Sequence, residues 1–210
     1  MRSEKSPSGQ KRRSAIEEVR RAQIIDSAVA TFAEFGYAQT SLARIAERAG
    51  ISKGVIAYHF AGRDNLVEQV VDHLYQQIIE FVVPHVSAES TAVGRLRARI
   101  RAVAAYMRTH PAQMVALSVI FDNLRDENGR LRYGDAVNEP YYRSLEDVFR
   151  AGQESGELRT FDTRVMAVTV QAAIDAMVAY TDSHPEHDIE RHAEELGDLF
   201  ERAVVATPQP

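Results

Sequence analysis

Apolar residues recur every three or four positions along most of the chain, which is the spacing of amphipathic helices. The first such pattern starts near Arg20, runs through Ile25, Val29 and Phe32, and should end at Gly36. The same reasoning predicts further helices over about 41–49, 52–60, 63–83, 92–109, 111–124, 139–154, 163–182 and 188–205. Because no segment alternates with the period of a strand, the sequence predicts an all-α fold of about nine helices.

Breaks in this pattern divide the chain into three parts. Residues 1–18 are polar and carry the basic run Lys11-Arg12-Arg13, so we expect a disordered basic tail. Residues 19–65 should form an N-terminal three-helix domain, and residues 66–210 a C-terminal helical bundle. Within that bundle, Pro84 should follow the end of the long 63–83 helix, and 125–138 should be a loop.

The segment from Ser41 to Phe60 predicts a helix-turn-helix unit, in which two short helices meet at a tight turn. The small residues Ala46 and Ala49 allow the helices to approach closely, and Gly50 can adopt the positive φ that such a turn needs. The outward face of the second helix should carry donors and small apolar groups suited to base edges: Lys53, Gly54, Val55, Tyr58 and His59.

These residues resemble the tetracycline-repressor-like (TetR) family of bacterial regulators. The resemblance rests on Ile45-Ala46, Ala49 to Gly54, Tyr58-His59-Phe60 and Arg63 to Leu66, preceded by Phe32 to Tyr37 and Thr40. It covers about 45 residues as one linked run, and beyond it only helix number and order are similar.

The resemblance implies a role for each matched position. The helix of residues 52–59 would enter the major groove of double-stranded DNA, with Lys53, Gly54, Val55, Tyr58 and His59 facing the DNA. Ser41, Arg44 and Arg63 would contact phosphates. The sequence departs from the family at Ala57, where a tyrosine commonly contacts the DNA backbone, which leaves one phosphate contact in doubt.

The resemblance also implies a small-molecule pocket in the bundle. Its expected walls are the 63–83 helix and the helices over 92–109, 111–124, 139–154 and 163–182, which are rich in Met and aromatic residues. The candidate lining residues are His73, Gln77, Met107, Met114, Leu117, Phe121, Tyr142 and Met166, with Asn123 and Gln171 as further polar candidates. For any one of these residues, ordinary core packing is the alternative. The composition favours a largely apolar effector.

The last two predicted helices carry the signature of a dimer interface. Small residues on the first would let a second helix approach closely, and the other has apolar residues at helical spacing. The candidate interface residues are Ala172, Ala176, Ala179, Leu196 and Phe200. The family forms homodimers in this way; packing within one chain is the alternative.

Charge and composition bear on the class of protein. The net charge is −5, but residues 1–65 carry 11 Lys and Arg against 7 Asp and Glu, whereas residues 66–210 carry 14 against 23. A basic front on an acidic remainder suits a polyanion-binding domain, although chance gives such asymmetry too. The chain has no Cys, no apolar run of membrane-spanning length and no apolar stretch after its basic start. We therefore expect a cytoplasmic protein without disulfides, thiolate metal sites or membrane contact.

The sequence shows no constellation of catalytic, cofactor-binding or metal-binding residues. It lacks a His-Glu-x-x-His motif and a Gly-rich phosphate loop, and His184, His187 and His192 are expected to be surface histidines rather than metal ligands. The predicted function is a ligand-responsive DNA-binding transcription regulator, a repressor that a small effector releases from its operator. The alternatives are an activator of the same fold and a helical adaptor that binds only proteins.

Overall fold

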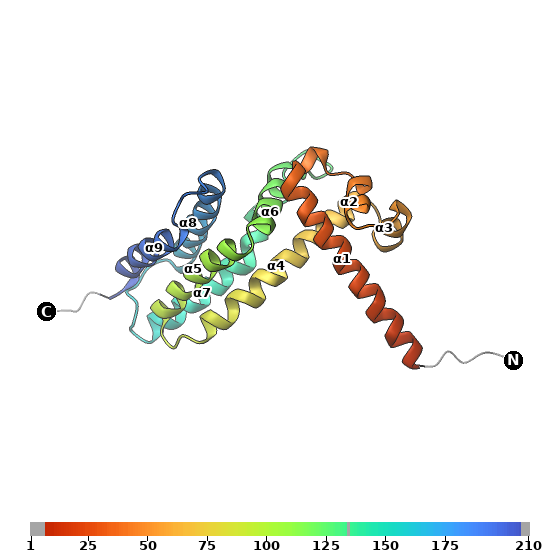
Figure 1. Ribbon diagram of the computed structural model, residues 1–210. Helices are drawn as coiled ribbons and strands as arrows, with labels where there is room; N and C mark the ends of the chain where they lie inside the picture. Colours follow the sequence, from red (N-terminus) through yellow and green to blue (C-terminus); the bar gives the residue numbers. More distant parts are fainter. Residues whose placement is uncertain (1–6, 134, 207–210) are drawn as a thin grey trace.

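In the computed structural model of the chain, the described residues are 7–133 and 135–206, and the side chains of residues 7–15, 135, 136 and 182 lie outside this description. The described residues form nine α-helices and one short 3-10 helix, Asp135–Asn138 (Figure 1). Within those ranges the only extended pairings are two isolated bridges, Arg125 with Leu131 and Leu158 with Val205. The all-α prediction is confirmed. No described helix is both long enough and apolar enough to cross a bilayer.

The helices form two groups joined by a long connecting helix. The N-terminal group is α1 (Pro7–Gln39), α2 (Leu42–Arg48) and α3 (Lys53–His59), and α4 (Arg63–Ser87) connects it to α5 (Ala92–Thr109), α6 (Pro111–Asn123), α7 (Glu139–Glu154), α8 (Thr163–Ser183) and α9 (Ile189–Val204). Figure 1 shows α2 and α3 at one end of the molecule and α8 and α9 at the other, with the first turns of α1 extending away from both groups.

The first helix begins earlier than the sequence predicted. Residues 7–18 were expected to be disordered, but α1 starts at Pro7, and only residues 1–6 of the expected tail lie outside the described range. Proline is tolerated at the first position of a helix, and most of residues 10–18 are good helix formers. The helical backbone breaks at Gly36, where φ is 72° and ψ is 177°, as the sequence predicted.

The fourth helix continues through Pro84, whereas the sequence predicted an end at Val83. Proline removes one hydrogen bond from a helix, here the bond that the carbonyl of Glu80 would accept. Glu80 is exposed, so water can replace the lost donor, and α4 continues to Ser87.

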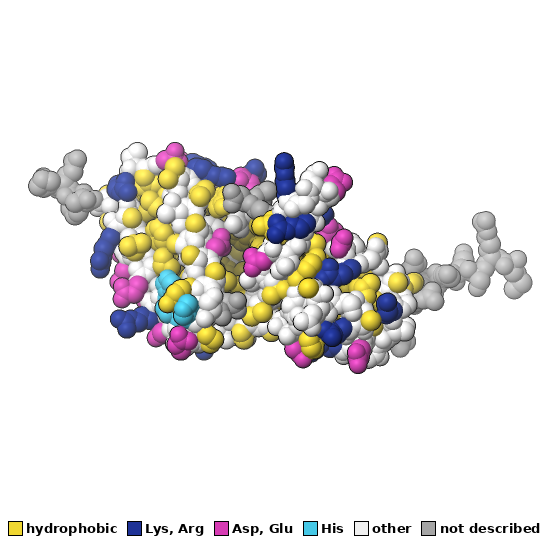
Figure 2. Space-filling view, turned by 90° about the horizontal axis from the view of Figure 1, so that it is seen from above, with side chains coloured by type: hydrophobic (Ala, Val, Ile, Leu, Met, Phe, Trp, Pro, Cys, Tyr) yellow, Lys and Arg dark blue, Asp and Glu magenta, His cyan; other side chains and the backbone are white. Residues whose placement is uncertain are grey.

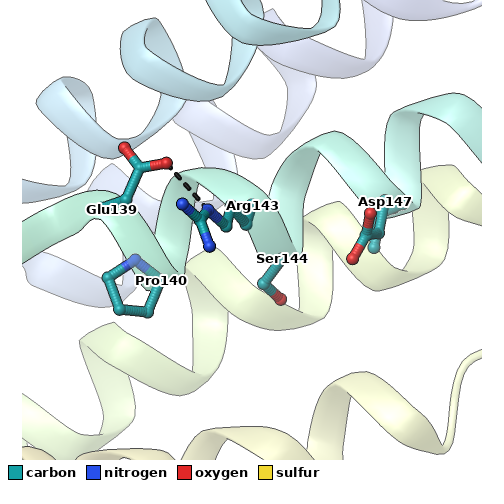
Figure 3. A pocket seen from close by; sticks show the side chains of 6 residues that line it. Glu139, Pro140, Arg143, Ser144 and Asp147 are labelled. Carbon is teal, nitrogen blue, oxygen red and sulfur yellow. Dashed lines mark hydrogen bonds and ion pairs between the residues drawn. The ribbon is translucent and has the colours of Figure 1, made fainter.

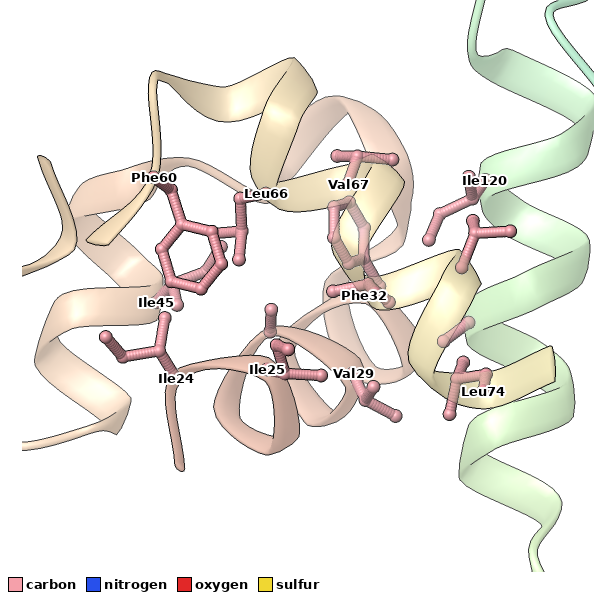
Figure 4. Close-up of a cluster of buried hydrophobic side chains, with 14 of the residues drawn as sticks. Ile24, Ile25, Val29, Phe32, Ile45, Phe60, Leu66, Val67, Leu74 and Ile120 are labelled. Atoms are coloured by element: carbon pink, nitrogen blue, oxygen red, sulfur yellow. The ribbon is translucent and has the colours of Figure 1, made fainter. Parts of the chain in front are cut away.

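One buried cluster joins the N-terminal helices to the bundle (Figure 4). Ile24, Ile25, Ala28, Val29 and Phe32 form one face of α1 and meet apolar residues of α2, α3 and α4. The same cluster includes Ala116, Leu117, Ile120 and Leu124 from α6 and the residue that follows it. The expected boundary between residues 65 and 66 is therefore crossed by continuous packing through α4 and α6.

A second cluster lies between α5, α7, α8 and α9. At its surface Arg97 of α5 contacts three carboxylates of α9: Asp198 at 2.6 Å, Glu201 at 2.7 Å and Glu194 at 3.1 Å. A Cβ at Gly197 would lie 3.4 Å from Cζ of Arg97, so the glycine gives the guanidinium room to lie against α9.

These contacts should make the stability of the bundle depend on pH. A hydrogen bond from Arg97 lowers the pKa of Asp198, and hydrogen bonds from Arg101 and Arg97 lower that of Glu194. A carboxylate whose pKa is lower in the folded state stabilises that state above its unfolded pKa, and this contribution is lost as the pH falls through the folded pKa. We expect Arg97→Met to unfold at a lower temperature than the unmodified protein at pH 7, and the gap to narrow below about pH 4.

Thermal unfolding monitored by circular dichroism between pH 7 and pH 3 measures this gap. Arg150→Met is the matched control, because Arg150 forms an ion pair within α7 with Asp147 and with no other described residue, and both side chains are largely exposed. A gap for Arg97→Met that stays constant over the whole range would show that the ion pairs do not stabilise the α5–α9 contact.

Candidate nucleic-acid interface

The helices α2 and α3 are joined by a turn whose backbone is fully bonded. The amide of Gly50 donates to the carbonyl of Glu47 at 3.1 Å, and that of Ile51 donates to the carbonyl of Ala46 at 3.0 Å. Gly50 has a φ of 65°, a left-handed conformation that strains other residues. Ile51 packs against the N-terminal cluster. The expected turn geometry is therefore present.

The outer face of α3 is open. Lys53 and Gly54 are exposed, and Lys53 makes no hydrogen bond or ion pair with any described residue. Tyr58 is 74% exposed, and among the described residues its hydroxyl forms one hydrogen bond, a long one of 3.4 Å to Glu17 of α1. Ile56 and Phe60, on the opposite face, are buried in the N-terminal cluster. The exposed face of α3 thus presents a cation and a phenol to a partner, and apolar packing of the opposite face fixes the position of the helix.

The other residues expected at the DNA are partly occupied within the chain. Val55 packs against the N-terminal cluster, and His59 is half-buried with its ring edge-on to Tyr58. The hydroxyl of Ser41 accepts a hydrogen bond from the amide of Arg44 at 3.3 Å and so caps α2. The guanidinium of Arg44 lies 4.3 Å from the ring centre of Phe35.

The family resemblance implies that Arg63 contacts a phosphate, but in the structure its guanidinium binds backbone carbonyls. Its Nε donates to the carbonyl of Thr40 at 3.1 Å and its Nη2 to that of Tyr37 at 2.8 Å. The guanidinium also stacks 4.1 Å from the ring centre of Tyr37. Arg63 therefore joins the start of α4 to the turn between α1 and α2, which leaves less of its guanidinium for phosphate.

Arg21 is a positioning residue that the sequence reasoning missed. From α1 it donates to the carbonyl of His59, at the end of α3, and to Oε1 of Gln69 of α4 at 2.9 Å. Its guanidinium also covers the ring of Phe60 at 4.6 Å. These contacts fix the end of α3 relative to two other helices. Nothing in the local pattern distinguishes Arg21 from a solvent-exposed arginine.

A cavity of about 1200 Å³ lies in the bundle and is lined mainly from α4, α5, α6, α7 and α8, the elements that the sequence predicted. Residues from 133–138 and from 185–190, at the start of α9, line it as well. Of the expected lining residues, Met107, Met114, Leu117 and Phe121 line it, and so does Gln171. His73, Gln77, Asn123, Tyr142 and Met166 are not among its lining residues. Gln77 instead accepts a hydrogen bond from Gln113. Tyr142 and Met166 pack in the second cluster, on faces of α7 and α8 that do not line the cavity.

A second hollow, of about 690 Å³, follows the side of α7 (Figure 3). Its charged groups are already paired, since Glu139 binds Arg143 at 2.9 Å and Arg164 at 2.6 Å. Hydrogen bonds from Arg164 and Arg143 hold the pKa of Glu139 at about 2. This hollow therefore offers less unpaired charge than the larger cavity.

Residues 24–70, which contain α2, α3 and the start of α4, match the sequence model of a family described as bacterial regulatory proteins, tetR family. This N-terminal segment belongs to the tetR family. Over 90 residues it is 38% identical to the HTH-type transcriptional regulator BetI of Burkholderia thailandensis, and this segment is 43% of the chain and 45% of that protein. The chain thus matches less than half the length of this tetR-family relative.

Solved structures extend the likeness to the rest of the fold. The transcriptional regulator FadR of Bacillus subtilis in complex with stearoyl-CoA is 22% identical, with a TM-score of 0.75 over 85% of this chain and 96% of that one. The ketosteroid transcriptional regulator KstR2 of Mycobacterium tuberculosis is 21% identical, with a TM-score of 0.69 over 90% and 96% of the two chains. At these identities the likeness establishes the fold alone, from α1 through the bundle.

The end of the molecule formed by α8 and α9 carries an apolar surface (Figure 2). Ala172, Ala176 and Ala179 are exposed on α8, as the dimer prediction requires. Large apolar side chains lie exposed on the same two helices: Val165, Val168, Tyr180 and Leu199.

Two residues that were expected at the dimer interface, Leu196 and Phe200, pack within their own chain instead. Phe200 is buried in the second cluster, and Leu196 is half-buried against it. The inward face of α9 is formed by Ile189, Ala193, Phe200 and Val204, which have helical spacing. Leu199, 62% exposed, takes the outward position instead.

Proposed function

We propose that the chain is a homodimeric, ligand-responsive transcription regulator that represses a promoter until an effector releases it from double-stranded DNA. The observation that carries this proposal is the open face of α3, with Lys53, Gly54 and Tyr58 exposed in a segment that matches the tetR family. An α-helix fits the major groove, where exposed donors can reach base edges. Because its target is DNA, we place the protein in the cytoplasm.

The packing offers a physical route from cavity to DNA. Leu117 of α6 lines the cavity and also belongs to the N-terminal cluster. On α4, Ile78 and Val82 line the cavity, while Leu66 and Leu74 are in the N-terminal cluster. A ligand that favours one position of α4 and α6 would change the position of α3 and the spacing of the two α3 helices in a dimer.

An apolar effector is consistent with the cavity lining, which includes Ile79, Val103, Met107 and Met114. The structurally similar FadR of Bacillus subtilis is in complex with stearoyl-CoA, so a fold of this kind accommodates a ligand with a long apolar part. Removal of such a ligand from water would supply most of the binding free energy.

The dimer proposal rests on the exposed apolar face of α8 and α9. We expect the unmodified protein to have twice the 23.5 kDa mass of one chain. Ala176→Glu should yield monomers, because a charge would be buried where two copies of α8 meet. Light scattering after size-exclusion chromatography measures the mass. Ala112→Glu, the same change at an exposed position of α6, is the control and should stay dimeric. A dimeric Ala176→Glu would place the interface elsewhere.

Binding to the DNA upstream of the protein's own gene tests the DNA claim. Phosphate contacts release counterions, so we expect the affinity to fall by roughly a thousandfold or more between about 50 and 200 mM salt. Fluorescence anisotropy with a labelled fragment and a scrambled fragment of the same length measures this dependence. Absent binding, or binding that salt does not change, would favour a helical adaptor that contacts only proteins.

A further inference from the structure

Arg99 is a charged residue inside the bundle. It lies on α5 with only 8% of its surface exposed, and it lines the large cavity beside apolar residues such as Val103 and Met107. Burial lowers its pKa, as expected for a cation removed from water. A buried guanidinium is costly unless an anion or several acceptors compensate it.

Within the described part of the chain, Arg99 has little such compensation. Its Nη2 donates to Oγ of Ser144 at 2.6 Å, and no described carboxylate forms an ion pair with it. Arg97, two residues earlier, contacts three carboxylates. A guanidinium has five N–H donors, so one serine satisfies a small part of it.

The unused donors of Arg99 have access to the cavity. No described buried side-chain nitrogen or oxygen lacks a hydrogen-bond partner. Among the described residues only Ser144 accepts a hydrogen bond from Arg99, and Arg99 lines the cavity, so its other N–H groups are placed to meet a ligand there. Tyr141 also lines the cavity near this position.

The other charged groups around the cavity are better satisfied. The two carboxylate oxygens of Asp175 accept from Gln171 at 2.9 Å and from Asn138 at 3.2 Å, and burial raises the pKa of this carboxyl. Arg108 is paired with Glu190 at 2.8 Å. Arg99 is thus the cation in this lining with unsatisfied donors, which favours an anionic ligand over a cationic one.

We propose that the cavity binds an apolar molecule with one acidic headgroup, which pairs with Arg99 and the neighbouring hydroxyl of Ser144. This inference deepens the proposed ligand response and rests on it. The headgroup would bridge α5 and α7, and the apolar part would lie against Leu117 and Phe121 of α6, the helix that also packs in the N-terminal cluster.

Two fluorescent probes that differ in their charge test the proposal with the full chain. These are 1-anilinonaphthalene-8-sulfonate and N-phenyl-1-naphthylamine, which share a ring system, but only the first carries a sulfonate. We expect the unmodified protein to bind the sulfonate about tenfold more tightly than the neutral probe. Arg99→Met should lose that preference and keep its affinity for the neutral probe, while Arg99→Lys should retain a preference for the sulfonate. Arg150→Met removes an exposed cation of α7 that does not line the cavity, so it is the control and should leave the preference unchanged.

The thermal stability of the same variants separates ligand binding from a structural role. Removal of an uncompensated buried charge should leave the ligand-free Arg99→Met as stable as the unmodified protein or more stable. The sulfonate should raise the unfolding temperature of the unmodified protein but not that of Arg99→Met. The proposal would be overturned, and Arg99 would be a packing residue, by either of two results. One is a strong loss of stability in ligand-free Arg99→Met, and the other is an equal loss of affinity for both probes in this variant.

Competition experiments on the unmodified protein test the preference of the cavity for an acidic ligand even if Arg99→Met does not fold. Decanoate should displace N-phenyl-1-naphthylamine at lower concentrations than 1-decanol does, since only the acid carries a charge. Equal displacement by both would overturn the proposal. None of these measurements uses DNA, so a charge preference without DNA binding would contradict the regulator alone, and DNA binding without a charge preference would contradict this inference alone.

Discussion

The double variant Lys53→Ala, Tyr58→Ala is expected to bind promoter DNA at least about thirtyfold more weakly than the unmodified protein, while it stays folded and dimeric. Each contact of a recognition helix to a base or phosphate contributes roughly 1–3 kcal/mol to binding, so the two losses add to about 2 kcal/mol or more, which corresponds to at least this factor. Neither side chain supports the fold, because Lys53 has no partner among the described residues and Tyr58 is largely exposed. Anisotropy measures the affinity, and circular dichroism and light scattering check the fold and the dimer.

Arg150→Ala is the control for a general effect of charge. Arg150 is an exposed cation of α7 in the bundle, away from α3, so its loss should change DNA affinity by less than about twofold. If the double variant binds as tightly as the unmodified protein, α3 is not the helix that contacts DNA.

Phe32→Ala should destabilise the protein by about 3–5 kcal/mol, as expected when a fully buried aromatic ring is replaced by a methyl group. Phe32 has no exposed surface, and its ring stacks 5.9 Å from that of Tyr37. It also lies in the cluster that holds α1, α4 and α6 together (Figure 4). Urea unfolding monitored by circular dichroism measures the change in free energy.

Tyr58→Ala provides the matched control for this aromatic truncation. Its ring is mostly in solvent, so its loss should change the free energy of unfolding by less than about 0.5 kcal/mol. The two variants should therefore affect different quantities. Phe32→Ala should lower the free energy of unfolding, and Tyr58→Ala should lower the affinity for DNA while the protein stays folded. A change below about 1 kcal/mol for Phe32→Ala would contradict the role of the N-terminal cluster as the joint between the two groups of helices.

Local features of the sequence predicted most of the helices, because they depend on neighbours within one or two turns. The turn at Gly50 and the break at Gly36 follow from a backbone conformation that glycine adopts without strain. The ends of helices are harder to predict from sequence. The sequence does not reveal that the exposed carbonyl of Glu80 tolerates the donor missing at Pro84, so the predicted end of α4 at Val83 is wrong. Nor does it reveal that the polar residues 7–18 extend α1 toward the N-terminus.

Contacts between distant residues could not be predicted in the same way. Phe200 and Leu199 are neighbours with similar hydrophobicity, yet one packs in the second cluster and the other lies on the surface. Which face of α9 turns inward depends on its packing against α5. The roles of Arg21 and Arg99 likewise depend on partners from 38 to 48 residues away, which spacing along the chain does not reveal.

We expect α3 of each protomer to enter the major groove of an operator. Protection of guanine N7 from methylation tests it most directly, since N7 is exposed only in that groove. With the promoter fragment, we expect protected guanines in two half-sites about 34–36 Å apart, or a multiple of that distance, and no protection with Lys53→Ala, Tyr58→Ala. A bound fragment whose N7 atoms in both half-sites stay as reactive as in free DNA would contradict it.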